Sequence, residues 1–424
     1  MVHIEELSPP PHPLAACARL RDLPDLHFLD SARDGTHSYL VADPWEVLHD
    51  PDELRARMGA HAEPAREGLP PFQGGAIGRI DYDWSGGAGP HFRFGLYDWA
   101  IAWDHVRDRA YLVSTGLPET GAARARRARE RAEMVRSRLR DASLPAPRPS
   151  PARTFSSNLG AATYVEAVRG ILRRMEAGEV EQLNLAHRLT APCGEDPWDL
   201  YVRLRAENPA PFAVFATSGE RTLVSASPER FFQLRKGRVE CRPIKGTRPR
   251  GRDEAEDRRL AEELLGSEKE RRENRMVAEL LMDELARACR RVELAEFCRL
   301  EKHPSVQHLV SVVEGELEDG RDPLDLLRAL FPPASIAGRP RRPAMEIIAE
   351  LEGCERGSYC GSVAWWSFGG DFDANVLIRT FVIEDGLLHL SVGSGIVAGS
   401  RPEEEWEETM HKARALLSAA GARA

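Results

Sequence analysis

The sequence predicts an α+β fold built on a largely antiparallel sheet system. Short apolar or alternating runs are separated by tight turns, and turns of this length join antiparallel neighbours. Long amphipathic helical patterns lie in blocks between these runs, whereas a parallel sheet would need strict alternation of strand and helix. The chain has 424 residues, which allows two to three domains at about 150 residues each.

The N-terminal part ends in a highly charged helical pattern over residues 121–142. Its interspersed acids favour a solvated helix face over a nucleic-acid surface. The Pro-rich stretch Ser143 to Arg153 follows, and it predicts an extended linker because proline lacks an N–H and restricts the residue before it. We therefore divide the chain into an N-terminal region 1–142, a linker 143–153 and a C-terminal region 154–424.

Beyond the linker, two series of hairpins are expected. The first contains strands over residues 212–217, 222–226, 231–234 and 238–244, and the second contains strands over 359–368, 375–383 and 387–392. Gly, Asp or Ser occupies each intervening turn, as hairpin turns require.

One long amphipathic helix is expected from Asp253 to Arg290, with a break near Gly266. Apolar residues recur at helical spacing between Met276 and Leu285, and Glu273 falls on this stripe, so we expect it to point inward. A buried carboxylate needs a partner, a proton or a metal. The alternative is an ordinary acidic residue near a helix start.

A second helix is expected from Pro402 to Ala420. Glu405, Glu408 and Lys412 are spaced three and four residues apart along one flank, a pattern typical of a solvated face. It gains a chemical role only if Glu408 meets Glu273 at a hard cation, which prefers carboxylate oxygens.

A lysine stands at the end of the predicted strand 238–244, in the run Pro243-Ile244-Lys245-Gly246-Thr247. Glycine lets a ligand approach the backbone closely. A lysine in a closed pocket can lose its charge through desolvation and become a nucleophile. By itself, Lys245 is more often a surface or salt-bridging residue.

Three further features are candidate ligand contacts. Gly393, Ser394 and Gly395 follow a predicted strand, and such a turn can offer backbone N–H groups to an anion, although an ordinary turn is the default. Arg379, at the end of a predicted strand, can pair with a carboxylate through two hydrogen bonds. His308 is a candidate general acid, although a lone histidine is usually structural.

Composition excludes several classes of protein. With 58 Lys+Arg against 67 Asp+Glu, the net charge is −9, which argues against a general nucleic-acid binder. No run of about 18 apolar residues predicts a membrane span, and the first residues lack the apolar core of a secretory signal. The seven cysteines include no Cys-x-x-Cys pair and indicate reduced thiols in a cytoplasmic protein.

In series, these segments resemble the chorismate-utilising enzymes, specifically component I of aminodeoxychorismate synthase and of anthranilate synthase. The resemblance covers nearly the whole chain and is densest from Gln182 to Ala413. Its motifs follow in order as Gln182-Leu183-Asn184-Leu185-Ala186, Ser227-Pro228-Glu229-Arg230-Phe231, Pro243-Ile244-Lys245-Gly246-Thr247, Arg356-Gly357-Ser358-Tyr359-Cys360-Gly361 and Ile378-Arg379-Thr380. The resemblance implies two stacked, mostly antiparallel sheets flanked by helices, with the two regions interleaved in one bilobed fold.

The resemblance also implies a Mg²⁺-dependent enzyme acting on chorismate. Glu273 and Glu408 match the metal carboxylates, with Glu405 as an outer member, and Lys245, His308 and Glu273 match catalytic positions. The implied substrate contacts are Gln182, Gly246, Thr247, Tyr359, Arg379, Gly393, Ser394 and Gly395. Because chorismate is a dianion, an acidic protein needs a concentrated local cationic site, and Mg²⁺ would supply two charges.

Lys245 favours one branch of the resemblance. Aminodeoxychorismate synthases typically carry lysine before this glycine, and its amine is thought to attack ring carbon 2 before ammonia adds at carbon 4. Anthranilate synthases usually carry alanine there. The implied product is 4-amino-4-deoxychorismate, a precursor of 4-aminobenzoate and folate. Isochorismate-forming relatives carry lysine where this chain has Gln182, which argues against water as the nucleophile.

Two binding partners follow from the resemblance. Component I receives ammonia from a glutamine amidotransferase, and no such domain is evident in this sequence, so we expect a separate subunit. Relatives also bind tryptophan, and the matching positions are Ser31, Pro211, Phe212 and Ala213. Asp30 replaces the commoner glutamate there, which leaves tryptophan binding open.

Three departures from the family pattern keep other functions open. Ala337 replaces a threonine, whose hydroxyl is worth about 0.5–1.5 kcal/mol if it hydrogen-bonds substrate; Met282 and Gly399 replace the usual Arg and Asp. The alternatives are anthranilate synthase component I, a specialised chorismate-aminating enzyme, and a non-catalytic paralogue that binds a glutaminase or an aromatic ligand.

Overall fold

The computed structural model of the protein describes residues 2–140, 142–303 and 306–422. These residues form two compact units. Unit 1 comprises residues 1–229, 336–370 and 375–424, and unit 2 comprises residues 230–335 and 371–374. Within the described residues, no helix has the length and apolar character needed to cross a membrane. All seven cysteines are unpaired.

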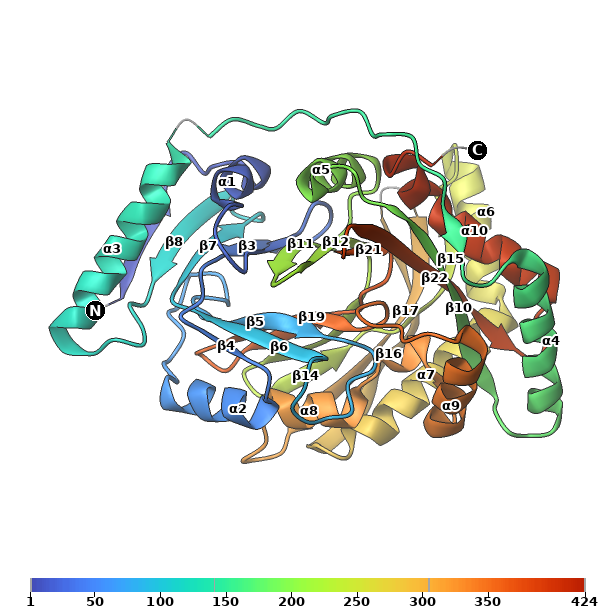
Figure 1. Cartoon of the computed structure of the whole chain (residues 1–424). Helices are drawn as coiled ribbons and strands as arrows, with labels where there is room; N and C mark the ends of the chain where they lie inside the picture. The colour runs from blue at the N-terminus through green and yellow to red at the C-terminus, as the bar shows by residue number, and fades with distance from the viewer. Residues whose placement is uncertain (1, 141, 304–305, 423–424) are drawn as a thin grey trace. The chain divides into compact units, whose positions relative to one another are not determined.

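The strands form two antiparallel sheets, which confirms the predicted α+β class (Figure 1). The first sheet has twelve strands and lies within unit 1. Its order is β1 (His3–Leu7), β8 (Arg109–Ser114), β7 (Trp99–Asp104), β3 (His37–Val41), β2 (His27–Asp30), β11 (Phe212–Ser218), β12 (Arg221–Ser227), β21 (Thr380–Glu384), β22 (Leu387–Val397), β10 (Gln182–Pro192) and β18 (Gly338–Arg339), with β9 (Ser156–Ser157) on β10. Residues from before and after the linker therefore share one sheet.

The second sheet has strands in both units. Unit 1 contains β19 (Ser362–Ser367), β5 (Gly75–Ile80), β6 (Phe92–Tyr97) and β4 (Glu46–Leu48) in this order. Unit 2 contains β15 (Ile244–Pro249), β17 (Val306–Leu317), β14 (Arg238–Cys241), β13 (Arg230–Arg235) and β20 (Phe372–Asn375), with β16 (Cys289–Lys302) on β17.

Ten α-helices surround the strands within the described part of the chain. Unit 1 holds α1 (Pro13–Leu20), α2 (Pro51–Ala60), α3 (Gly121–Leu139), α4 (Ala161–Glu176), α5 (Pro197–Glu207), α9 (Arg341–Glu352) and α10 (Pro402–Ala419). Unit 2 holds α6 (Glu254–Gly266), α7 (Glu268–Leu285) and α8 (Pro323–Leu330).

Both faces of the first sheet are buried within unit 1. On one face, α1, α3, α5 and α10 pack through apolar side chains such as Cys17, Val135 and Leu204. On the other face, Tyr39 and Val214 of the first sheet pack against Ile77 and Trp365 of the second. The predicted stacking of two sheets is therefore confirmed inside this unit.

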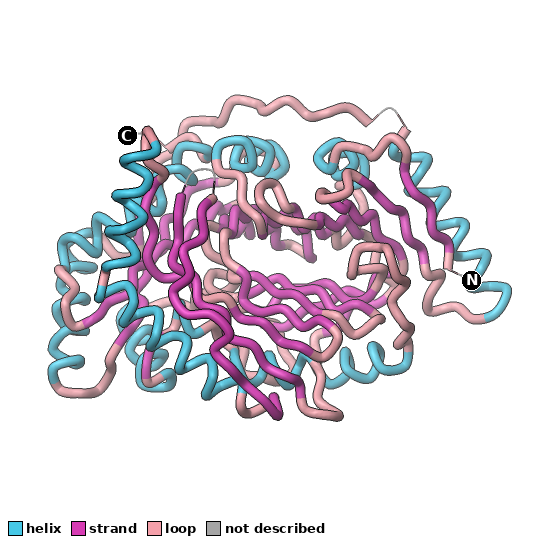
Figure 2. The backbone as a smooth tube through the Cα atoms, turned by 180° about the vertical axis from the view of Figure 1, so that it is seen from behind, coloured by secondary structure: helices cyan, strands magenta, loops and turns pink. Residues whose placement is uncertain are grey.

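The predicted linker is an irregular strand-free stretch until an isolated bridge at Arg153 (Figure 2). Arg203 of α5 donates to the carbonyl of Arg148 at 2.9 Å, and the N–H of Arg153 donates to the carbonyl of Gly421 at 2.8 Å. The extended stretch is thus attached to unit 1 by hydrogen bonds rather than by a sheet ladder.

Several predicted elements need correction. The strand expected over 238–244 stops at Cys241 because Pro243 has no N–H for the ladder, and β15 begins at Ile244. The helix expected to reach Arg290 ends at Leu285, whereas its break near Gly266 is confirmed.

The strands expected over 359–368 and 375–383 are also shorter than predicted. Cys360 has φ 64° and lies in a turn, so β19 begins only at Ser362. Arg379, predicted at the end of a strand, has φ 52° and precedes β21. Left-handed residues interrupt a β-ladder, and apolar composition alone did not indicate these interruptions.

Replacing Trp365 by alanine should strongly destabilise unit 1. Its ring is 5% exposed and meets Tyr39 and Phe72 edge-on at 5.6 and 5.5 Å. Loss of a large buried aromatic costs about 3–5 kcal/mol. Leu387→Ala is the control, since Leu387 is 38% exposed and should change stability by less than about 0.5 kcal/mol. Guanidinium unfolding followed by circular dichroism measures both; equal shifts in midpoint would contradict the assigned core.

Candidate active site

The predicted site residues fall into two groups, one in each unit. Unit 1 contains Gln182, Tyr359, Arg379, Gly393–Gly395 and the two acids of α10, Glu405 and Glu408. Unit 2 contains Lys245, Gly246, Thr247, Glu273 and His308. The approach of Glu273 to Glu408 remains a prediction.

The ladder between β10 and β22 determines where the backbone of Gly395 points. Asn184 lies opposite Gly395, and its N–H bonds away from β22, to the carbonyl of Ala337 at 3.0 Å. In an antiparallel ladder, directly opposite residues either both bond to each other or both point outward. The N–H of Gly395 therefore points away from β10.

The same argument applies two residues earlier. Ala186 lies opposite Gly393, and its N–H donates to the Glu352 carboxylate at 2.8 Å instead of to β22. Gly393 must then direct its N–H and C=O away from β10. Its carbonyl indeed accepts a hydrogen bond from Lys412 at 3.0 Å. The two glycines thus present their N–H groups along the outer edge of β22.

Arg379 lies just before β21, at the point where the outer edge of β22 loses its pairing with β21. β21 pairs with β22 only as far as Phe381 opposite Leu390, and Arg379 lies just before β21. Its carbonyl accepts a hydrogen bond from the N–H of Ala226 at 3.0 Å, which holds the backbone. Water reaches the side chain, yet desolvation lowers the pKa of its guanidinium, an effect that Glu229 partly offsets. An arginine beside outward N–H groups suits a carboxylate.

Tyr359 is held by a buried ion pair that the sequence did not single out. Arg356 bonds Glu352 through Nε at 2.9 Å and Nη2 at 2.7 Å, and it also donates to the carbonyls of Ile336 and Asn184. Its guanidinium lies 5.8 Å from the centroid of the Tyr359 ring. Burial raises the pKa of the Tyr359 hydroxyl well above its usual value, so this hydroxyl stays protonated and can donate.

The two acids of α10 have different surroundings. Glu405 was predicted on a solvated flank, but it is buried and accepts a hydrogen bond from the Ser394 hydroxyl. The helix turns this side toward β22 because Thr409, Ala413 and Leu416 continue the buried face. Glu408 is exposed and pairs with Lys412 at 2.7 Å.

In unit 2, a β-bulge displaces Lys245. Ile244 pairs with Val310 and Thr247 pairs with His308, so Lys245 and Gly246 together oppose a single residue of β17. A bulge bends its strand and re-aims the side chain. Lys245 is half-buried.

Gly246 adopts φ 83°, a conformation that favours glycine. A Cβ at this position would lie 2.9 Å from Leu264 of α6 and 3.1 Å from the Glu270 carboxylate of α7. Glycine is therefore required both by the backbone conformation and by the close approach of two helices.

His308 and Glu273 lie on elements that pack beside this bulge. The Thr247 hydroxyl is hydrogen-bonded to Nδ1 of His308 at 2.8 Å, which orients the imidazole. Glu273, predicted to point inward, is half-buried. Its neighbour Asn274 is fully buried and donates to the carbonyl of Leu309 at 3.2 Å.

The residues matched to a tryptophan site come together in unit 1. The Ser31 hydroxyl is hydrogen-bonded to the carbonyl of Pro211 at 3.3 Å. Ala213 pairs with Asp30 across β11 and β2. Phe212 begins β11 and is half-buried.

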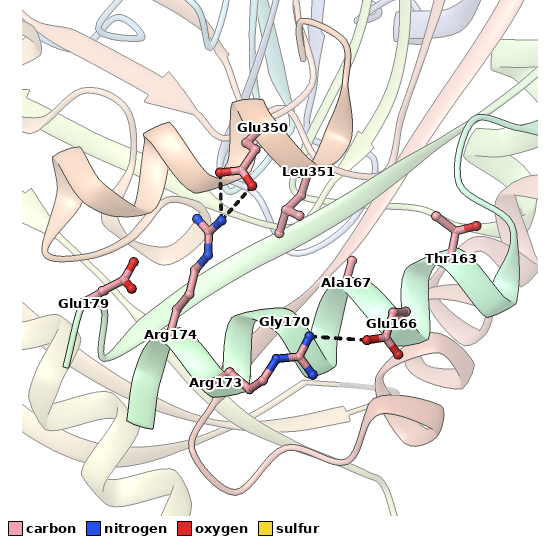
Figure 3. Close-up of a pocket in the computed structure, with 9 residues that line it drawn as sticks. All are labelled: Thr163, Glu166, Ala167, Gly170, Arg173, Arg174, Glu179, Glu350 and Leu351. Atoms are coloured by element: carbon pink, nitrogen blue, oxygen red, sulfur yellow. Dashed lines mark hydrogen bonds and ion pairs between the residues drawn. The ribbon is translucent and has the colours of Figure 1, made fainter. Parts of the chain in front are cut away.

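A separate surface hollow of about 590 Å³ lies between α4 and α9 (Figure 3). Arg174 pairs with Glu350 across it at 2.6 Å, and Arg173 pairs with Glu166 at 3.3 Å. None of the predicted site residues lines this hollow, and its arginines are paired with glutamates of the same lining.

Residues 25–418 match the chorismate binding enzyme family. The chain belongs to this family. It is therefore a chorismate-utilising enzyme, and the predicted family resemblance is confirmed.

Curated relatives within the family carry two names. Anthranilate synthase component 1 of Thermus thermophilus is 40% identical over 392 residues, covering 89% of this chain and 82% of the relative. Aminodeoxychorismate synthase component 1 of Salmonella typhimurium is 37% identical over 396 residues, covering 90% and 83%. Crystalline anthranilate synthase component I from Streptococcus pneumoniae has a TM-score of 0.79 at 26% identity, covering 91% of this chain and 92% of that chain.

Sequence reasoning missed the roles of Asn184, Glu352 and Arg356 in this chorismate-binding fold. Two of them lie in motifs that carried the resemblance, so their positions were visible in the sequence. Their function was not visible, because the Arg356–Glu352 pair acts on Asn184 of β10, which is far away in the chain. The direction of the Asn184 N–H follows from strand register.

Stability should fall as the pH falls from 6.5 to 4 because His187 is buried. Its Nε2 is hydrogen-bonded to the Thr409 hydroxyl of α10 at 3.0 Å, and desolvation lowers its pKa from 6.5 to about 4. Between these values the unfolded chain binds the proton more readily, which removes up to about 3 kcal/mol.

Urea unfolding at several pH values measures this dependence. His187→Phe should reduce the slope, and His27, whose pKa burial also lowers to about 4, contributes to the slope that remains. The exposed His411 of α10 is the control, and His411→Phe should keep the wild-type slope. An unchanged slope in His187→Phe would contradict the assignment.

Proposed function

We propose that this chain is component I of an aminodeoxychorismate synthase. It aminates chorismate at ring carbon 4 with ammonia and forms 4-amino-4-deoxychorismate, the precursor of 4-aminobenzoate. The observation that carries the proposal is Lys245, which a β-bulge displaces beside the left-handed Gly246 and next to the Thr247–His308 pair. Relatives named aminodeoxychorismate synthase component 1, at 31–37% identity, support it.

The proposed chemistry begins at the Lys245 amine. Its lone pair forms a bond to ring carbon 2, both conjugated ring double bonds shift by one position, and the bond from carbon 4 to its hydroxyl breaks. His308, oriented by Thr247, donates a proton so that the hydroxyl leaves as water. Ammonia then attacks carbon 4 and loses a proton, both double bonds shift back, and the bond from carbon 2 to the Lys245 nitrogen breaks, which releases the lysine amine.

The substrate carboxylates have matching partners in unit 1. The N–H groups of Gly393 and Gly395 and the Arg379 guanidinium suit anions, and the protonated Tyr359 hydroxyl can donate as well. In the proposed reaction these groups bind and orient the ring dianion.

Magnesium is part of the proposal. Glu273, Glu405 and Glu408 provide the carboxylate oxygens that Mg²⁺ prefers, and Glu408 is exposed and already pairs with a cation, Lys412. These carboxylates are the residues that would hold the ion. When bound, Mg²⁺ would neutralise substrate carboxylate charge and assist departure of the ring hydroxyl. The Ser394 hydroxyl orients Glu405 toward β22.

A glutamine amidotransferase subunit is the proposed source of ammonia. The relatives bear the name component 1, which denotes one part of a multi-component synthase. The family match occupies residues 25–418.

Anthranilate synthase component I is the second candidate function. The Thermus thermophilus relative at 40% identity favours it. In that reaction ammonia attacks carbon 2 directly and no lysine nucleophile is needed. Lys245 is the feature that discriminates between the two.

Lys245→Ala tests the covalent role. The purified protein receives chorismate, Mg²⁺ and ammonium salt, and products are separated chromatographically after addition of the lyase that releases 4-aminobenzoate. We expect wild-type protein to form 4-aminobenzoate and Lys245→Ala to lose this activity on the order of 10³-fold, or to divert to fluorescent anthranilate, because the nucleophile is gone.

The matched control is Lys236→Ala, which removes a lysine from the turn between β13 and β14 in the same unit. Its activity should equal that of the wild type. Undiminished 4-amination by Lys245→Ala would contradict the covalent role, and anthranilate as the sole wild-type product would select the second candidate function.

Glu408→Gln tests the metal assignment. We expect the Mg²⁺ concentration for half-maximal chorismate consumption to rise roughly 10–100-fold, because one charged ligand is lost. Stability should change little, since the lost pair with Lys412 is exposed. Glu407→Gln alters an exposed neighbour and should leave the Mg²⁺ dependence unchanged. Equal behaviour of the two variants would exclude Glu408 as a ligand.

A further inference from the structure

One face of the β10–β22 ladder carries two carboxamides above two glycines. Side chains alternate between the faces of a strand, and Leu183 and Leu185 of β10 pack with Val168 of α4 and Ile347 of α9. Gln182 and Asn184 therefore project from the opposite face. Gly395 lies directly across from Asn184, and Gly393 lies across from the next residue on the same face, Ala186.

Gly395 leaves open space beside Gln182, and the missing side chain of Gly393 makes room for the Asn184 oxygen. A Cβ built at Gly395 would have a single neighbour within 4 Å, Nε2 of Gln182 at 3.8 Å. A Cβ at Gly393 would lie 2.7 Å from Oδ1 of Asn184. The Asn184 oxygen thus lies over Gly393, in a position that any side chain there would obstruct.

The Asn184 side chain is buried without the partner that burial normally requires. It is 9% exposed, and its Oδ1 has no hydrogen-bond partner within the described part of the chain. Its backbone is fixed on both sides, by the carbonyl of Ala337 at 3.0 Å and by Arg356 at 2.7 Å. The backbone at Asn184 is therefore held in place, so a shift of the strand cannot bring the unpaired oxygen to a partner.

Asn375, in the same unit, is a buried asparagine whose side-chain oxygen and nitrogen are both hydrogen-bonded. Its Oδ1 accepts from the N–H of Val363 at 2.8 Å, and its Nδ2 donates to the carbonyl of Phe212 at 3.2 Å. Buried polar groups are nearly always paired in this way, so an unpaired one calls for an explanation. A ligand that supplies a donor explains Asn184.

The missing partner must be a hydrogen-bond donor, since a carboxamide oxygen only accepts. The carboxylates of chorismate offer no proton, whereas its ring hydroxyl does. We propose that Asn184 contacts the substrate and that its Oδ1 accepts a hydrogen bond from the ring hydroxyl of chorismate. The proposal rests on the proposed function for the identity of the ligand. The amino group that replaces this hydroxyl in the product is also a donor, so the same oxygen serves both.

Asn184→Leu is the test variant, because leucine has a similar size and removes the polar group. Isothermal titration calorimetry measures the binding of chorismate in the presence of Mg²⁺ and in the absence of ammonia. We expect Asn184→Leu to bind chorismate at least roughly tenfold more weakly than the wild type. A chorismate analogue that lacks the ring hydroxyl should bind the two proteins equally.

Unfolding measurements provide the matched control. Asn184→Leu should keep or raise the wild-type midpoint, since it removes an unpaired buried polar atom. Asn375→Leu should lower the midpoint, because it leaves the N–H of Val363 and the carbonyl of Phe212 unpaired.

Three results would overturn the inference. They are unchanged chorismate binding by Asn184→Leu, a fall in its midpoint equal to that of Asn375→Leu, and equally weakened binding of the analogue lacking the hydroxyl. The proposed function fails separately, through the wrong product or no product from the wild-type protein, so the two failures are distinguishable.

Discussion

The buried ion pair between Arg356 and Glu352 is the interaction on which the candidate site in unit 1 depends. Arg356 joins the end of α9 to the carbonyls of Asn184 and Ile336, and Glu352 also accepts the N–H of Ala186. A buried charge must be paired to be tolerated. The pair also occupies backbone groups of β10 on the side away from β22, namely the N–H of Ala186 and the carbonyl of Asn184. Asn184 and Ala186 then cannot bond to β22, which turns the N–H groups of Gly393 and Gly395 toward the open edge.

The two units contribute different chemistry, and each uses an interruption of regular structure. In unit 1, Arg379 in a left-handed conformation ends the ladder and leaves N–H groups and a guanidinium at one edge. In unit 2, a bulge and the left-handed Gly246 displace Lys245 from the regular alternation of β15. Sheets hold such residues rigidly because the flanking ladders restrict the backbone. The proposed anion-binding and nucleophilic groups therefore belong to stable strands rather than to long loops.

Asn184 and Asn375 illustrate how one residue type serves structure or function. Both are buried in the same unit, but only Asn375 has partners for its oxygen and its nitrogen. An unpaired oxygen over Gly393 is costly in the free protein and favourable once a donor is bound. The comparison separates a carboxamide that supports the fold from one that is available to a ligand.

The sequence by itself determined the α+β class, the chorismate-utilising family and the elements that carry most candidate residues, because periodicity, turn residues and ordered motifs are local. It predicted the helix break near Gly266 and the hairpins of β11 to β14, but it overextended the strands around Cys360 and Arg379. Only the tertiary structure decided that Glu405 is buried, that Lys245 lies in a bulge and that Asn184 has an unpaired oxygen. These properties depend on register and on contacts between distant segments, such as Arg356 with Asn184, and strand register follows from pairing rather than from the residues of one strand.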